Sequence, residues 1–161
     1  MQKEYSDLIL KVDSFVEEKM KVFEGKIKCK PGCYTCCVGG LTITKLEADA
    51  ILEFLETNNI KLPLESNHKN LCKNLDKDGR CLIYQVRPIV CRSHGVPLDY
   101  KEGAFKVRTV CPKNFQNEKI SDLSLTDVLN MDTVNVLLGM LNKHIYGTIE
   151  RVPLEDLGRN V

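Results

Sequence analysis

The sequence reads Cys29-Lys-Pro-Gly-Cys33-Tyr-Thr-Cys36-Cys37, so that four cysteines fall within nine residues. Four more cysteines follow, at Cys72, Cys81, Cys91 and Cys111, giving eight in a chain of 161 residues. Such a dense run indicates a disulfide framework, a metal site or a redox site. The segment 25–40 is also rich in glycine, which allows tight turns, and we expect it to be a loop.

The expected cellular compartment and the metal preferences of thiolate ligands both favour a metal site over disulfides. The longest apolar run near the amino terminus is Leu8-Ile9-Leu10, too short for the core of a signal peptide. We therefore expect a cytoplasmic protein with reduced thiols. Disulfide-dense scaffolds are also usually shorter than about 80 residues. Thiolates select zinc, copper(I) and iron–sulfur clusters among the common metal centres.

Composition predicts one globular domain over residues 1–161, with a cysteine-cluster core at about 29–112. Hydrophobic residues make up 43% and charged residues 28%, and the net charge is +1. This charge gives no general attraction to nucleic acid or to an anionic membrane. The chain has no Trp, which argues against a base-stacking surface, and no segment has the roughly 20 apolar residues of a membrane helix. We predict neither a nucleic-acid nor a membrane partner.

Three segments have the apolar periodicity of amphipathic helices. The first covers 3–24 and ends near Gly25. The second begins at the capping box Thr44-Lys-Leu-Glu47 and runs to about residue 58. The third is expected to be capped by Asp132 and to end at Gly147. Its predicted buried face consists of Val134, Leu137, Leu138, Leu141 and Ile145.

The remaining segments predict irregular structure and one hairpin. Residues 59–82 are polar, and 82–91 reads as a short helical turn broken at Pro88. Residues 96–100 and 105–110 flank a predicted turn at Lys101-Glu102-Gly103. The expected fold is α+β and mostly helical, with helices packed around an irregular cysteine-rich metal centre beside a short β-hairpin. Because 56–82 is poor in apolar residues, we expect metal to replace part of the core.

Spacing indicates how the thiols bind. Cys33-x2-Cys36 lets two thiolates hold one metal from a single turn, and Cys29 adds a third. The spacing from Cys29 to Cys36 is also used for a 4Fe–4S cluster in radical S-adenosylmethionine enzymes. Adjacent side chains diverge, so Cys36 and Cys37 are expected to reach two metals or different irons of one cluster. Eight thiolates divide naturally into two sets of four, but spacing leaves the division open.

Cations beside the cysteines fit an anionic centre. A tetrathiolate zinc site and a 4Fe–4S cluster each carry about −2. Arg87 and Arg92 are the predicted cofactor-binding residues, because a guanidinium can lower thiol pKa values and donate hydrogen bonds to sulfur. Lys26 and Lys28 are interpreted as surface lysines. His94 is open to three interpretations, as a ligand, a proton carrier or a turn residue.

These motifs together resemble the YkgJ-like cysteine-cluster family, named for its CxxCxxCC motif and described as zinc- or iron-chelating. The resemblance covers residues 29–112, with a first gap of three residues here instead of two. It implies that the metal ligands are Cys29, Cys33, Cys36, Cys37, Cys72, Cys81, Cys91 and Cys111. It also implies that Arg87, Pro88 and Arg92 belong to the motif. A bacterial flagellin lysine methylase is similar to this family over its cysteine region.

Three functions remain open. The first is a small metal-binding protein that holds an iron–sulfur cluster or zinc, with iron–sulfur ahead, in electron transfer, redox sensing or metal handling. The second is a structural zinc module in a protein-interaction domain. The third is a cluster-dependent S-adenosylmethionine enzyme such as a protein lysine methylase, although the sequence has no GxGxxG motif and no repeated βα pattern. The sequence identifies no redox or protein partner.

Overall fold

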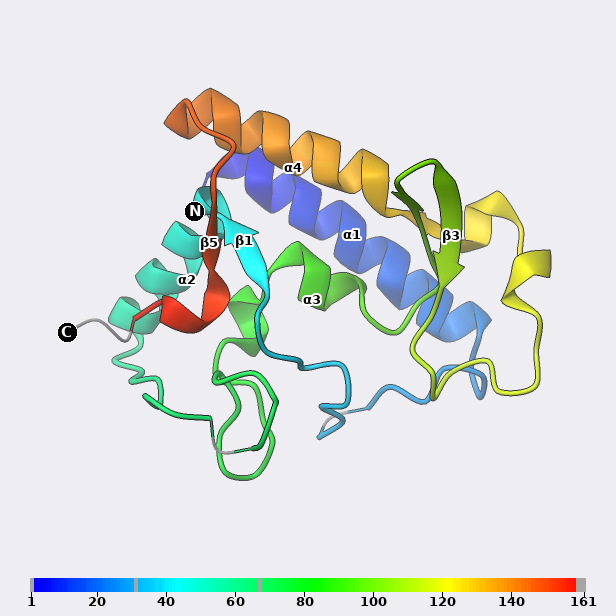
Figure 1. Cartoon of the computed structure of the whole chain (residues 1–161), viewed down its shortest axis with the longest axis horizontal. Coiled ribbons are helices and arrows are strands. Elements are labelled where there is room, and N and C mark those ends of the chain that lie inside the picture. The colour runs from blue at the N-terminus through cyan, green and yellow to red at the C-terminus, as the bar shows by residue number, and fades with distance from the viewer. Residues whose placement is uncertain (1, 31, 67, 159–161) are drawn as a thin grey trace.

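Two long helices lie side by side along one side of the molecule, and the cysteine-bearing loops lie on the other (Figure 1). The structure is a computed structural model that describes residues 2–30, 32–66 and 68–158. The long helices are α1 (Lys3–Val22) and α4 (Met131–Tyr146), with α2 (Lys45–Thr57) packed against α4. The fold is α+β and mostly helical, as the sequence predicts. Among the described residues, no helix has the length and apolar character needed to cross a membrane.

Helix α1 confirms the first predicted helix and ends two residues early, at Val22. Gly25 follows in the left-handed region, at φ +79°, where the chain turns away. The buried face of α1 packs with α2, α3 and α4 into the first apolar core. That core contains Tyr5, Leu8, Ile9, Val12, Leu46, Ala50, Ile89, Met131, Val134 and Leu138.

The capping box predicted for α2 is present. Thr44 accepts a hydrogen bond from the Glu47 backbone, and the Glu47 carboxylate accepts from the Thr44 backbone at 2.9 Å. The other carboxylate oxygen accepts from the Ile89 backbone at 3.0 Å, at the start of α3 (Ile89–Ser93). Glu47 is only 1% exposed, so this buried carboxylate fixes α3 against α2.

Two predictions for α4 are wrong. The N-cap is Asn130, whose side chain accepts from the Thr133 backbone at 3.0 Å, and Asp132 instead accepts from the Lys101 backbone at 3.2 Å. The chain enters the helix earlier because β4 (Leu129–Asn130) pairs with β2 and ends at Asn130. Leu137 is 46% exposed, beside the buried stripe rather than in it. The end at Gly147, with φ +71°, is confirmed.

The predicted hairpin is confirmed with a shifted turn. Its strands are β2 (Leu98–Glu102) and β3 (Phe105–Thr109), so Lys101 and Glu102 belong to a strand and the chain turns at Gly103. The parallel pairing of β2 with β4 was not predicted. A second small sheet pairs β1 (Thr42–Thr44) with β5 (Arg151–Pro153), which joins chain segments far apart in the sequence.

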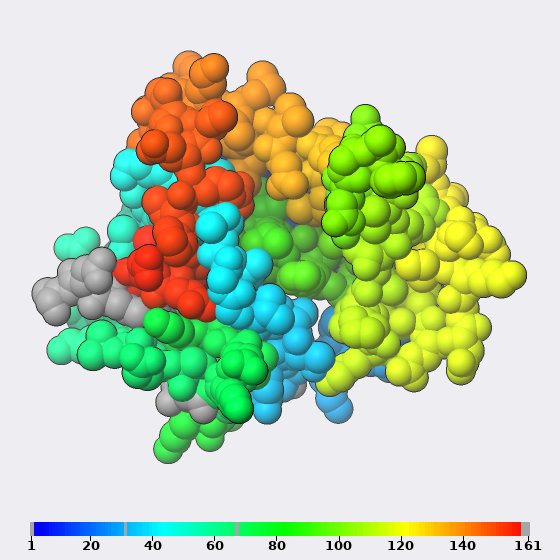
Figure 2. Space-filling model, viewed as in Figure 1, coloured from blue at the N-terminus to red at the C-terminus, as the bar shows by residue number. Residues whose placement is uncertain are grey.

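The stretch 59–82 is irregular, as predicted, yet it contributes to the core. Although this stretch is poor in apolar residues, its Leu62 and Leu75 are both buried. The predicted helical turn is a 3-10 turn, η1 (Tyr84–Val86), which Pro88 separates from α3. Figure 2 shows the molecule hollowed between the hairpin and the chain around β1 and β5.

Candidate metal centre

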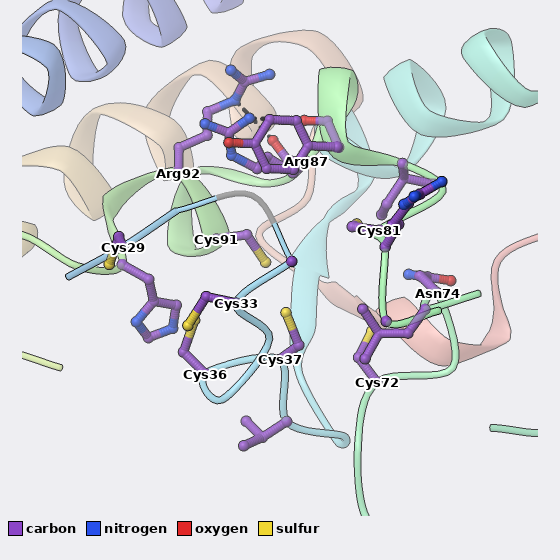
Figure 3. Close-up of a pocket in the computed structure, with 18 of the residues that line it drawn as sticks. Cys29, Cys33, Cys36, Cys37, Cys72, Asn74, Cys81, Arg87, Cys91 and Arg92 are labelled. Atoms are coloured by element: carbon purple, nitrogen blue, oxygen red, sulfur yellow. Dashed lines mark hydrogen bonds between the residues drawn. The ribbon is translucent and has the colours of Figure 1, made fainter. Parts of the chain in front are cut away.

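The cysteines gather around one cavity of about 740 Å³ (Figure 3). The structure describes all eight cysteines as free thiols, and seven of them line this cavity. Cys111 is the exception. The lining cysteines are Cys29, Cys33, Cys36, Cys37, Cys72, Cys81 and Cys91.

Two tight turns form the cysteine-rich loop. The Cys33 backbone donates to the carbonyl of Lys30, and the Cys37 backbone donates to the carbonyl of Tyr34, both at 3.0 Å. Gly32 takes a left-handed conformation at φ +84°. These turns aim several thiols inward from a short stretch of chain, as the sequence predicts.

The segment that carries Cys72 and Cys81 folds back onto this loop. The Cys72 backbone donates to the Cys37 carbonyl at 2.8 Å, and a β-bridge joins Leu75 to Cys81. The Tyr34 ring occupies the space that a side chain at Gly79 would need, and it stacks on His68 at 5.2 Å between ring centroids. The glycine of the Asp78-Gly79 turn therefore permits the close approach of the two loops.

The two predicted cofactor-binding arginines both line the cavity but also make structural contacts. Arg92, 6% exposed, donates to the Asp13 carboxylate at 2.6 Å and to the carbonyls of Arg87 and Gln85. Arg92 thus ties α3 to α1. The Arg87 guanidinium stacks over the Tyr84 ring, with 4.0 Å between its Cζ atom and the ring centroid. Their role toward a cofactor remains a prediction.

Asn114 contacts Cys29 from outside the predicted site. This asparagine is 3% exposed, and its amide nitrogen donates to the Gly95 carbonyl at 2.7 Å and to the Cys29 Sγ at 3.5 Å. Its amide oxygen accepts from the Lys28 backbone at 2.8 Å. No spacing in the sequence singled out Asn114, because all three contacts are long-range.

Burial raises the pKa of three of the cysteine thiols. Desolvation is the largest cause that raises the pKa of Cys29, of Cys81, and of Cys91, the last to about 12. The charge of Arg87 opposes this effect at Cys81, after a backbone hydrogen bond from Ile83. A metal ion that binds these thiols must therefore displace their protons, so its affinity depends on pH.

In the adjacent pair Cys36 and Cys37, a hydrogen bond between the two thiols is the largest cause of both pKa shifts. A hydrogen bond with Cys37 lowers the pKa of Cys36 to about 6, and the positive charge of His94 acts in the same direction. The same hydrogen bond raises the pKa of Cys37. Both thiols face the one cavity and contact each other, although adjacent side chains were expected to diverge. His94 also lines the cavity, which leaves all three of its interpretations open.

The donor set fits a soft metal centre, because seven sulfur donors surround one space. No three His, Cys, Asp or Glu side chains among the described residues form a ready-made ion site. Lys30 lines the cavity, whereas Lys26 pairs with Glu118 at 2.7 Å on the surface, as interpreted.

A thiol-lined cavity in a small helical scaffold defines a class of metal-chelating domains. A family model named CxxCxxCC, described as a "putative zinc- or iron-chelating domain", matches residues 28–129, more than half of the chain and all eight cysteines. The protein belongs to this family. Comparisons with curated proteins and with solved structures give no match.

Proposed function

We propose that this protein binds an iron–sulfur centre in its thiol-lined cavity and serves in electron transfer or redox sensing in the cytoplasm. The observation that carries the proposal is the cavity of about 740 Å³ with seven cysteines on its wall. Cysteine thiolates are the usual ligands of iron–sulfur clusters.

The size of the cavity favours a cluster over a single zinc ion. Four thiolates at about 2.3 Å from zinc enclose the ion completely and need no separate space. A cluster adds several irons and inorganic sulfides inside its ligands and therefore needs a cavity. Lys30, Arg87 and Arg92 on the same wall offset the negative charge of such a centre.

The exposure of the thiols supports a redox role. Cys72 is buried, whereas the four cysteines of the loop are only half-buried. A centre held there lies close to the surface, where solvent exposure helps to set its reduction potential and a redox partner can approach.

The test is the composition of protein purified anaerobically without a metal-binding tag, after incubation with ferrous iron and sulfide. We expect bound iron with acid-labile sulfide, a broad visible absorption band, and bleaching of that band on reduction. Zinc with a featureless visible spectrum would contradict the iron–sulfur assignment and leave a structural zinc module. Protein with neither metal would contradict metal binding altogether.

A matched pair of variants tests whether the metal centre lies in the cavity. C36S and T35S each leave a serine in the same loop, but only C36S removes a thiol. We expect C36S to bind less metal than the wild type and T35S to bind as much as the wild type does. Equal metal content in the two variants would contradict the proposed location.

A further inference from the structure

We infer that the eight cysteines form two separate four-thiol centres, divided at the peptide bond between Cys36 and Cys37. This inference rests on the proposed metal binding and assigns its ligands. The first centre contains Cys29, Cys33, Cys36 and Cys111. The second contains Cys37, Cys72, Cys81 and Cys91.

Backbone contacts tie three members of the second centre together. The Cys72 backbone donates to the Cys37 carbonyl at 2.8 Å, and bridges join Val38 to Leu71 and Leu75 to Cys81. Side chains can rotate when a metal binds, but these contacts hold the three backbones in one neighbourhood.

Cys91 joins this group from α3. Figure 3 shows Cys72 and Cys81 on one side of the cavity and Cys29, Cys33 and Cys36 on the other, with Cys37 and Cys91 between them. Because Cys29, Cys33, Cys36 and Cys111 already complete the first set of four, we assign Cys91 to the second.

Asn114 ties Cys111 to Cys29 in the first centre. The Asn114 backbone donates to the Cys111 carbonyl at 2.8 Å, while its side chain donates to the Cys29 Sγ. Cys33 and Cys36 follow Cys29 in the same loop. After burial and the Asn114 bond, the pKa of Cys29 responds to the charges of Cys111, Cys33 and Cys36. Cys111, which does not line the cavity, thus has its thiol neighbours in this set.

The two sets are anchored in different apolar cores. Cys72 lies within the core of Ile43, Ile51 and Ile83, against which Cys37 and Cys81 also pack. Cys29 packs against a separate core that contains Phe23, Ile27, Val96 and Phe115. Because close-packed cores resist rearrangement, Cys29 is held in the first set, and Cys37, Cys72 and Cys81 are held in the second.

Each set supplies a complete ligand shell. Four thiolates suffice for one 4Fe–4S cluster or for one tetrahedral ion. In this division the neighbours Cys36 and Cys37 each serve a different centre, so the two centres meet at adjacent residues.

Double variants test the division, with iron per chain after loading with ferrous iron and sulfide as the readout. C29S and C81S are each expected to retain about half of the wild-type iron, since each leaves one complete set. The double variant C29S/C111S should retain as much as C29S, because both changes fall in one set. The double variant C29S/C81S should retain almost none.

The division is overturned if C29S/C81S retains as much iron as either single variant, or if C29S/C111S loses all of it. It is also overturned if every single variant loses all iron, since that indicates one shared centre. Far-UV circular dichroism of the metal-free proteins shows whether each variant folds, and C33S replaces C29S, or C91S replaces C81S, where it does not. Wild-type protein that binds no metal would instead contradict the proposed function itself, together with this division.

Discussion

At the scale of single residues, Gly95 shows how closely the scaffold fits its thiols. Gly95 has φ +107°, a conformation that residues with a side chain rarely adopt. A Cβ atom built on it would lie 2.6 Å from the Cys29 Sγ. The position therefore requires glycine for its backbone conformation and for the space that the sulfur occupies.

Substitution of Gly95 is expected to disturb both stability and binding. G95A should lower the free energy of unfolding by about 1–3 kcal/mol, because alanine strains the backbone and displaces Cys29. Urea denaturation of the metal-free protein measures this loss. G139A is the matched control, since Gly139 lies inside α4 with open space around it. We expect G139A to gain about 0.5–1 kcal/mol from helix propensity, and equal stability of the two variants would contradict the argument.

At the scale of elements, the site depends on how its short segments are held by the longer ones. Helix α3 has five residues, too few to be stable alone. Its first backbone amide is bound by Glu47 of α2, and its Arg92 is paired with Asp13 of α1. Helices α1 and α2 thus position the short helix that carries Cys91.

Loss of one carboxylate oxygen should loosen this arrangement. In E47Q, one of the two carboxylate oxygens becomes an amide donor that cannot accept from Thr44 or Ile89. We expect the free energy of unfolding to fall by about 2–3 kcal/mol, measured by urea denaturation. E56Q on the exposed face of α2 is the control and should change stability by less than about 0.5 kcal/mol. A small effect of E47Q would show that the buried link contributes little.

The hairpin makes a contribution to the stability of the fold that depends on pH. Its buried Asp99 accepts two hydrogen bonds from the Arg108 guanidinium, at 2.7 and 2.9 Å, and this pairing lowers the pKa of Asp99 to about 2. A folded-state pKa below the unfolded value means that the stabilisation is present above about pH 4 and is lost as the pH falls to about 2.

Between about pH 4 and pH 2, we expect the free energy of unfolding of the wild-type protein to fall by about 2 kcal/mol as the Asp99–Arg108 pair is lost. D99N cannot titrate at this position, so its free energy of unfolding should depend less steeply on pH between about 4 and 2. Urea denaturation at several pH values measures the difference. Parallel pH profiles for the two proteins would contradict the assignment.

These elements also show what the sequence could and could not predict. The capping box at Thr44 and Glu47 and the glycine after α4 are local signals, and both were predicted. The predicted N-cap of α4, Asp132, is wrong, and Asn130, a residue type that caps helices equally well, takes this position. Only the pairing of β4 with β2, a contact between distant segments, selects Asn130.

For the site, the sequence identifies eight candidate ligands but does not predict their surroundings. Ligand types and spacing are visible in the chain, and seven of the eight share the cavity. Asn114 gave no signal, because it meets Lys28, Gly95 and Cys29 only after folding. The structural role of Arg92 likewise depends on its partner Asp13 in α1, 79 residues away in the sequence.

At the scale of the whole molecule, a helical half supports a half made of loops (Figure 1). The first apolar core holds α1, α2, α3 and α4 together, while the described residues of segments 25–40 and 59–82 have little regular structure. Loops with few backbone hydrogen bonds open more easily than packed helices. Metal binding should therefore stabilise the two halves unequally.

Hydrogen exchange can detect this difference. On loading with ferrous iron and sulfide, backbone amides in 25–40 and 68–82 should exchange more slowly, because ligand binding suppresses local opening. Amides in the middle of α1 and α4 should change less. C29S/C81S, carried through the same loading, is the control and should show no protection of the loops. Uniform protection across the wild-type chain would indicate that metal controls global unfolding instead.

The closing of the cavity by a distant part of the chain has a consequence for biosynthesis. Leu154 lines the cavity, its backbone donates to the Leu41 carbonyl, and Glu155 accepts from the backbone of Gly40, 115 residues earlier. On the ribosome, the cysteine loop therefore emerges long before the residues that cover it. Its thiols stay accessible to metal donors and to oxidants throughout that interval, so the cofactor can enter before the wall around Leu154 is complete.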